Sequence, residues 1–207
     1  MGLYSRYILP TLIDCACSTR PIRRQREKVV PLAAGDVLEV GCGAGANFPL
    51  YNAQSVRKVF ALEPAEKMIE RAEQAAGRIP DLDIEFLRTG GEAVPLEAAS
   101  VDTVVFTFTL CTIPDWRASL AEARRVLKPG GRLIYSEHGG APDPGVARWQ
   151  RRLEPIQKRF GGGCHLTRVP PDMLSTTGFE IVEGQTMYLP KTPKVMGYAY
   201  WGQARAA

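Results

Sequence analysis

A short apolar segment that runs into three alternating glycines constrains the fold of this chain most. Val37–Val40, interrupted only by Glu39, precedes Gly41, Gly43 and Gly45. A buried strand that enters a tight glycine turn and then a helix presents backbone N–H groups to a nucleotide-like ligand. We therefore expect a strand, a glycine turn, and a helix that starts just after Gly45.

Two glutamates distinguish this turn from a common phosphate-binding loop. Glu39 lies beside the glycines, where a carboxylate would repel a pyrophosphate but suits a ligand with an ammonium or sulfonium group. Glu63 follows Gly41 by about 22 residues and ends the apolar run Val59–Leu62. An acid at that spacing can accept hydrogen bonds from both ribose hydroxyls. The alternative is that both glutamates are ordinary solvated charges.

Beyond the glycine stretch, strand and helix patterns alternate along the chain. A helix is expected after Pro64, since Met68, Ile69, Ala72 and Ala76 share one face. The other expected strands lie at 84–87, 101–108, 132–138, 179–182 and 195–201. A helix is expected at 116–127, and the Lys-Pro-Gly-Gly sequence at 128–131 should terminate it. Such alternation is typical of an α/β protein with a parallel sheet and helices on both faces.

Three motifs in this order resemble the class I S-adenosylmethionine-dependent methyltransferases. They are the glycine stretch at 39–47, Leu62-Glu63-Pro64 with Met68, and Leu127-Lys128-Pro129-Gly130-Gly131. The resemblance runs from about Val37 to His138. It implies a single Rossmann-like, doubly wound, seven-stranded sheet that is mostly parallel with an antiparallel last strand.

The resemblance also divides the chain into functional segments within one domain, 1–207. Residues 1–30 would form an N-terminal helical segment that acts as a lid, and residues 31–138 the cofactor-binding core. An insertion at 139–171 would line the acceptor site, and residues 172–207 would supply the closing strands.

By the same resemblance, S-adenosylmethionine is the cofactor, and particular residues are expected to hold it. The backbone of Gly41 and Gly43 would lie along its methionine part, Glu39 near its amino group, and Glu63 at its ribose hydroxyls. The remaining expected cofactor-binding residues are Cys42 and Asn47 in the glycine stretch, Pro64 and Met68 along the adenine, Gly91 and Glu92, and Thr107.

His138 follows the strand at 132–138 and is the candidate catalytic residue. It could accept a proton or shape the acceptor site, but a histidine that is merely hydrogen-bonded at a strand end is equally compatible with the sequence. The five cysteines are odd in number and scattered, and neither histidine has metal-ligand spacing with Cys15 or Cys17. We therefore expect no metal site, a reducing compartment and a cytoplasmic location.

Three further segments narrow the resemblance. Glu137-His138, Gly163–Arg168 and Gly197-Tyr198-Ala199 look like the small alkyl-thiol S-methyltransferases, which implies a small, rather apolar thiol as acceptor. Methyltransferases of quinone precursors and of phospholipid amines share the central motifs and remain alternatives. From another class, a NAD-dependent oxidoreductase stays open, because Gly41, Gly43 and Ala46 also satisfy a dinucleotide fingerprint. A protein that binds the cofactor without transferring its methyl group also stays open.

Charge and hydropathy limit the partners. A net charge of +4 does not by itself indicate nucleic acid, and no apolar run is long enough to span a membrane. Basic residues gather at 20–28 and at 148–159. They could form solvated helix faces or a weak peripheral contact with an anionic membrane surface, and the stretch at 20–28 could also contact an acidic substrate. The expected partner is a small-molecule acceptor, and the oligomeric state is left open.

Overall fold

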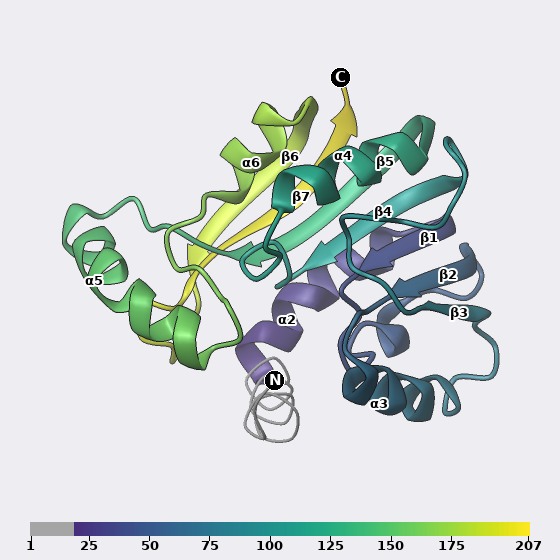
Figure 1. Ribbon diagram of the computed structural model, residues 1–207, viewed down its shortest axis with the longest axis horizontal. Helices are drawn as coiled ribbons and strands as arrows, with labels where there is room; N and C mark the ends of the chain where they lie inside the picture. The colour runs from purple at the N-terminus through teal and green to yellow at the C-terminus, as the bar shows by residue number, and fades with distance from the viewer. Residues whose placement is uncertain (1–18) are drawn as a thin grey trace.

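The structure is a computed structural model that describes residues 19–207, a seven-stranded sheet covered by helices (Figure 1). Expectations for residues 1–18, including Cys15 and Cys17, lie outside the described residues. The strands are β1 (Gly35–Val40), β2 (Val56–Leu62), β3 (Ile84–Leu87), β4 (Val101–Thr107), β5 (Leu127–His138), β6 (Phe179–Tyr188) and β7 (Tyr198–Ala206).

The strand order is β3-β2-β1-β4-β5-β7-β6, which confirms the predicted α/β fold. Strands β1 to β5 pair in parallel, whereas β7 is antiparallel to both of its neighbours. After β1 the chain builds the sheet outward to β3, and then returns to place β4 on the other side of β1. Ligands of open α/β sheets bind at the carboxyl ends of the strands beside such a reversal.

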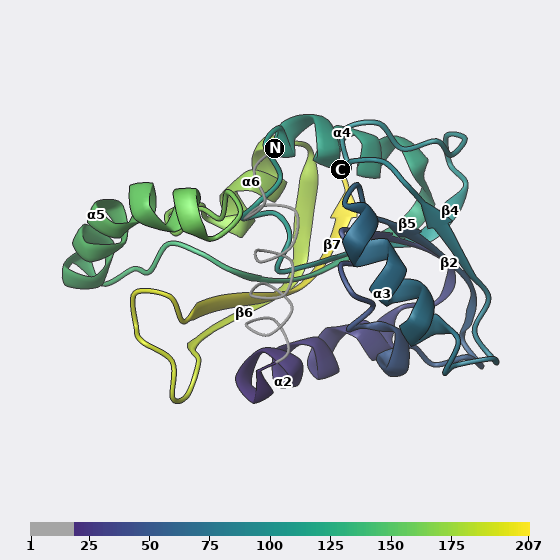
Figure 2. The same ribbon diagram turned by 60° about the horizontal axis from the view of Figure 1, so that its bottom comes forward.

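Helices cover both faces of the sheet and divide the core into two layers. The α-helices are α2 (Arg20–Val29), α3 (Glu66–Ala76), α4 (Trp116–Val126), α5 (Pro144–Phe160) and α6 (Pro170–Thr176), and η2 (Val30–Leu32) and η3 (Phe48–Leu50) are 3₁₀ helices. Side chains alternate along each strand. Val104 and Phe106 therefore pack with α4 and α6, and Val105 packs with α2 and α3. Figure 2 shows α4 and α6 on one side of the sheet and α2 on the other.

The helix predicted just after Gly45 is wrong: η3, a single 3₁₀ turn, takes its place. Tyr51 is already extended, with φ −68° and ψ 138°. Since β2 begins at Val56, too few residues remain for a helix of several turns. The glycine loop therefore has no helix of several turns behind it.

The closing strands are longer than their apolar patterns suggested. The strand expected at 179–182 continues to Tyr188, and the one expected at 195–201 begins at Tyr198 and continues to Ala206. Most side chains of β6 are exposed, so its polar half lacks the alternation that identifies a half-buried strand. The insertion after β5 contains α5, which extends away from the sheet (Figure 1).

Candidate cofactor and acceptor site

The glycine loop lies at the carboxyl end of β1, packed tightly against its surroundings. Gly41, Gly43 and Gly45 have φ angles of 73°, 57° and 81°, in the left-handed region that favours glycine. The N–H of Gly41 donates to the carbonyl of Leu62 at 2.8 Å, and a Cβ on Gly41 would lie 2.4 Å from Thr109 Cγ2. The backbone conformation thus disfavours larger residues at all three positions, and lack of space also excludes them at Gly41 and Gly45.

Glu63 extends from the end of β2 to the same loop. Its Oε2 accepts from the N–H of Gly43 at 3.1 Å, and its Oε1 accepts from the N–H of Ala65 at 2.9 Å. Burial raises the pKa of this carboxyl group, while the two N–H groups oppose the shift. Each carboxylate oxygen keeps acceptor capacity. The Glu63 carboxylate therefore fits a ligand with two adjacent hydroxyls, as a ribose has. The side chain of Met68 lies next to Gly43 in the same region.

Glu39 lies beneath the loop rather than at its surface. It is 1% exposed, and it accepts from Asn47 Nδ2 at 2.9 Å and from the Tyr51 hydroxyl at 2.8 Å. Asn47 Nδ2 also donates to Thr107 Oγ1 at 2.9 Å. Burial raises the pKa of Glu39 to about 7, although Tyr51, Arg26 and Asn47 oppose that shift. The structure thus joins three predicted site residues in one buried network.

Arg26 belongs to this network and was missed by the sequence analysis. Its side chain is buried, its Nη1 donates to Asn47 Oδ1 at 3.4 Å, and its guanidinium lies 5.3 Å from the ring centroid of Phe108. Arg26 therefore belongs to neither of the alternatives considered for the basic stretch 20–28, a solvated helix face or a surface contact, because its side chain points inward. Its helical spacing with Ile22 and Val29 was the available signal, since the three share the inward face.

Gly91 lies close to the end of β1. A Cβ on this glycine would lie 2.3 Å from Ser119 Oγ and 2.9 Å from Val40 Cγ1. The adjacent Glu92 is partly buried, and its side chain folds back over Gly90. The backbone at 90–92 can therefore approach a ligand held by the glycine loop, without a side chain from position 90.

His138 ends β5 and lies against two cysteines from distant parts of the chain. Its Nε2 is 3.1 Å from Cys164 Sγ, and one side-chain atom each of Cys111, His138 and Cys164 lie within 4.8 Å of one another. A hydrogen bond with Cys164 and the nearby His138 hold the pKa of Cys111 well below its usual range, against burial. Burial opposes protonation of His138, but the charge of the Cys111 thiolate raises its pKa.

Glu137 connects this cysteine–histidine cluster to the glycine loop. Its Oε1 accepts from the N–H groups of Thr109 at 2.8 Å and Leu110 at 3.1 Å. Thr109 Oγ1 in turn lies 3.4 Å from the carbonyl oxygen of Gly41. Burial, and then the charge of Cys111, raise the pKa of Glu137 to about 8. The segment that begins at Thr109 therefore contacts both the predicted cofactor loop and the cluster.

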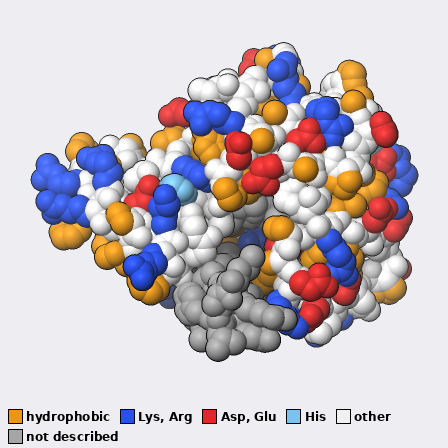
Figure 3. Space-filling model, viewed as in Figure 1, with side chains coloured by type: hydrophobic (Ala, Val, Ile, Leu, Met, Phe, Trp, Pro, Cys, Tyr) orange, Lys and Arg blue, Asp and Glu red, His pale blue; other side chains and the backbone are white. Residues whose placement is uncertain are grey.

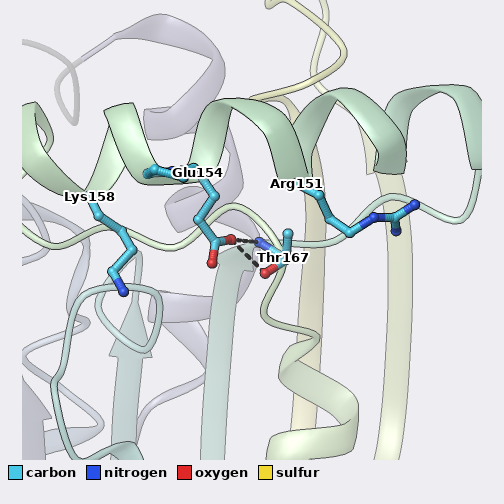
Figure 4. Close-up of a pocket in the computed structure, with 5 residues that line it drawn as sticks. Arg151, Glu154, Lys158 and Thr167 are labelled. Atoms are coloured by element: carbon cyan, nitrogen blue, oxygen red, sulfur yellow. Dashed lines mark hydrogen bonds between the residues drawn. The ribbon is translucent and has the colours of Figure 1, made fainter.

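A pocket of about 430 Å³ lies along α5, lined by Arg151, Glu154, Pro155, Lys158 and Thr167 (Figure 4). None of these residues belongs to the glycine loop. The Glu154 carboxylate accepts from the N–H of Thr167 at 2.8 Å and that of Leu166 at 3.1 Å. Glu154 thereby fixes the segment that carries Cys164, and Arg151 and Lys158 add two basic side chains to the lining of the pocket.

The raised pKa of Glu39 predicts a specific pH dependence of stability. An unfolded glutamate titrates near 4.5 and Glu39 near 7, so the folded protein binds the extra proton between these values. The free energy of unfolding should therefore fall as pH rises from about 4.5 to about 7, and stay lower above it. Relative to wild type, Glu39→Gln should gain up to about 3 kcal/mol at pH 8 and almost nothing at pH 4.5.

Urea unfolding of both proteins across this pH range measures the effect, with Glu97→Gln at an exposed position as the matched control. The control should follow the wild-type curve. If wild type and Glu39→Gln gave parallel curves from pH 4.5 to 8, Glu39 would be ionised throughout and its pKa would not be raised.

Known proteins share both the sequence and the fold of this chain. A family model described as a methyltransferase domain matches residues 38–135. Thiol S-methyltransferase TMT1B of Rattus norvegicus is 37% identical over 172 residues, which cover 79% of this chain and 69% of the relative. The Homo sapiens TMT1B is 35% identical over 178 residues, covering 81% and 72%.

Solved structures agree with this likeness. The S-adenosylmethionine-dependent methyltransferase structure from Methanosarcina mazei superposes with a TM-score of 0.66 at 23% identity, covering 83% of this chain and 92% of the other. Its fold is therefore shared, and the sequence likeness to the thiol methyltransferases gives the family. The chain belongs to the class I S-adenosylmethionine-dependent methyltransferases.

Proposed function

We propose that this methyltransferase acts on a small, rather apolar thiol. The observation that supports a thiol is the extent of the likeness to TMT1B, whose alignment over 172 residues extends well beyond the 38–135 core. Segments outside the cofactor core therefore contribute to the likeness, and these include parts of the chain that we assign to the acceptor site, 139–171. The assignment of 31–138 to the cofactor and of 172–207 to sheet closure follows the same division.

In this proposal, the glycine loop and its neighbours hold S-adenosylmethionine. The backbone of Gly41–Gly43 lines the methionine part, Asn47 supports the loop from beneath, and the buried charge of Glu39 attracts the ammonium group through the loop. Glu63 accepts the ribose hydroxyls. The adenine lies between Pro64 and Met68 on one side and the backbone of Gly91 and Glu92 on the other, with Thr107 at the floor of the site.

Methyl transfer needs alignment more than acid–base chemistry. The bound cofactor supplies an activated methyl group, and the protein orients the acceptor for in-line attack and excludes water. A thiol with a pKa near 8.5 needs little help to ionise. We assign His138 to the acceptor site, where it favours the thiolate form of the acceptor.

Glu63→Ala should weaken binding of S-adenosylhomocysteine at least tenfold, about 1.4 kcal/mol. The reason is that the variant loses the acceptor of the ribose hydroxyls and a hydrogen bond to Gly43. Isothermal titration calorimetry measures the change. Glu70→Ala on the exposed side of α3, which pairs only with the nearby Lys67 in the described structure, is the control and should bind normally. Unchanged affinity in Glu63→Ala would mean that the ribose contact is misassigned.

Purified protein should release S-adenosylhomocysteine when it is offered small alkyl or aryl thiols. Turnover only with a hydroxylated quinone precursor, or only with phosphatidylethanolamine vesicles, would instead favour one of the alternative acceptors. Tight cofactor binding with no turnover on any of the three would contradict the thiol proposal and favour a non-catalytic cofactor-binding protein. A thermal shift with NAD but none with S-adenosylhomocysteine would contradict the assigned cofactor site.

We further propose that α5 rests on an anionic membrane surface. Its exposed hydrophobic residues Trp149, Ile156 and Phe160 follow helical spacing along one stripe. The guanidinium groups of Arg152 and Arg159 lie 5.3 Å and 5.9 Å from the rings of Trp149 and Phe160. Figure 3 shows basic and hydrophobic side chains together over the end of the molecule formed by α5. Such a helix suits the interface of an anionic bilayer.

This contact would be peripheral. Within residues 19–207, no helix is long and apolar enough to cross a bilayer. The described cysteines Cys42, Cys111 and Cys164 are all free, which favours a reducing compartment, so we propose the cytoplasmic side of the membrane.

Trp149→Ser combined with Ile156→Ser should weaken binding to phosphatidylserine-containing vesicles at least about tenfold, because both side chains leave water on docking. Vesicle co-sedimentation measures the change, and binding should also fall as salt rises. Val182→Ser is the control, since Val182 is 64% exposed on β6 and away from α5. Equal binding by the double variant and the control would contradict the role of α5.

A further inference from the structure

We infer that Cys111, His138 and Cys164 form a zinc site whose open coordination position binds the sulfur of the methyl acceptor. Their ligand atoms lie within 4.8 Å of one another, although the three residues come from separate parts of the chain. The identity of the acceptor as a thiol rests on the proposed function, whereas the metal site itself rests on this geometry alone.

The donor set selects zinc over the hard divalent cations. Two sulfurs and one imidazole nitrogen suit zinc, whereas calcium and magnesium prefer oxygen ligands. Zinc–ligand distances of about 2.3 Å for sulfur and 2.0 Å for nitrogen place tetrahedral ligands about 3.5 Å apart. His138 Nε2 and Cys164 Sγ, at 3.1 Å, need only a small separation to reach this spacing.

The number of ligands indicates a reactive site rather than a structural one. Structural zinc sites have four protein ligands, and catalytic sites have three with the fourth position open. Among the described residues, the group contains only two cysteines and one histidine. Cys111 and Cys164 are 4% and 9% exposed, and His138 is partly exposed, so the open position has a route to solvent.

Hydrogen bonds fix the segment that carries Cys111. Glu137 accepts hydrogen bonds from the N–H groups of the two residues that precede Cys111. Arg168 Nη1 donates to the carbonyls of Leu110 at 2.6 Å and Ile113 at 2.8 Å. Backbone atoms of the two cysteine segments also meet, because the N–H of His165 donates to the carbonyl of Cys111 at 2.8 Å. A metal site with ligands held in this way loses little entropy on binding.

The position of Cys164 is fixed from α5. Glu154 accepts from two backbone N–H groups that follow Cys164, and His165 Nδ1 lies 3.2 Å from Glu154 Oε1. The insertion at 139–171 therefore places one zinc ligand, Cys164, next to His138 at the end of β5. In the proposed acceptor site, this is the contribution of the insertion.

The site is correctly placed for the transfer. Thr109 contacts Gly41 of the glycine loop and precedes Cys111 by two residues, so a sulfur bound at this site would lie near a cofactor held by the loop. The thiol's proton goes to solvent as its sulfur binds. A lone pair of that sulfur forms the new S–CH₃ bond, and the electron pair of the broken sulfonium–carbon bond stays on the departing sulfur. No atom of the metal or protein changes oxidation state.

Metal content is the first measurement. Protein purified under reducing conditions from zinc-supplemented cells should contain about one zinc per chain by plasma mass spectrometry. Cys111→Ser and Cys164→Ser should each lower zinc affinity at least about tenfold. Cys42→Ser, which removes a buried cysteine outside the cluster, is the matched control and should keep its zinc.

Two measurements on the wild-type sequence remain decisive even where a variant fails to fold. Zinc should protect Cys111 and Cys164, but not Cys42, from alkylation, and a chelator should remove that protection, as read by peptide mass spectrometry. Cobalt-substituted protein should show sulfur-to-cobalt charge-transfer absorption that changes when a small thiol is added without S-adenosylmethionine.

The inference and the proposed function can fail separately. Absence of zinc, zinc retained in both cysteine variants, or a Cys111–Cys164 disulfide would overturn the metal site, even if thiols were methylated. If the cobalt spectrum did not change when a thiol was added, the inference that the acceptor's sulfur binds the metal would be wrong. Bound zinc and a thiol-responsive spectrum would establish the site, and absence of methyl transfer under those conditions would contradict only the proposed function.

Discussion

A carboxylate buried at the carboxyl end of β1 dictates the shape of the cofactor loop. Glu39 is almost completely removed from water, and a buried charge is tolerated only with hydrogen bonds and a compensating charge. Asn47 and Tyr51 supply the hydrogen bonds, and Arg26 supplies the charge. Asn47 and Tyr51 are thereby held beneath the glycines, and Arg26 anchors α2 to the same point.

A second buried carboxylate, at the end of β5, also needs hydrogen bonds, but it receives them from the backbone. Glu137 is also buried, and its donors are the backbone N–H groups of Thr109 and Leu110. Strand β4 lies between β1 and β5, so the segment that leaves β4 is held from both sides. Thr107 bonds to the network of Glu39, and Thr109 bonds to Glu137. One short segment thereby sets the position of the cofactor loop relative to His138.

Strand periodicity and glycine turns are local properties, so they predicted the strands of a parallel sheet, whereas the doubly wound order was implied by the resemblance to known methyltransferases. The sequence also predicted Glu63 at the glycine loop, since that pairing needs only two neighbouring parallel strands. The role of Arg26 was not predictable from charge, because a lone inward arginine in a basic stretch looks like its solvated neighbours. The polar half of β6 was missed for a related reason: its pairing with β7 stabilises it without an apolar face.

The cysteine–histidine cluster, which we propose for the acceptor site, is harder to predict from sequence than the glycine loop. The cofactor loop is one continuous stretch, whereas His138 and Cys164 lie 26 residues apart and Cys111 precedes both. No spacing motif exists for a site assembled from the ends of β4 and β5 and an inserted loop. Glu154 and Arg168 must fold the insertion back before the three side chains meet. The geometry of the cluster therefore depends on how the insertion packs, and the parallel core alone does not determine it.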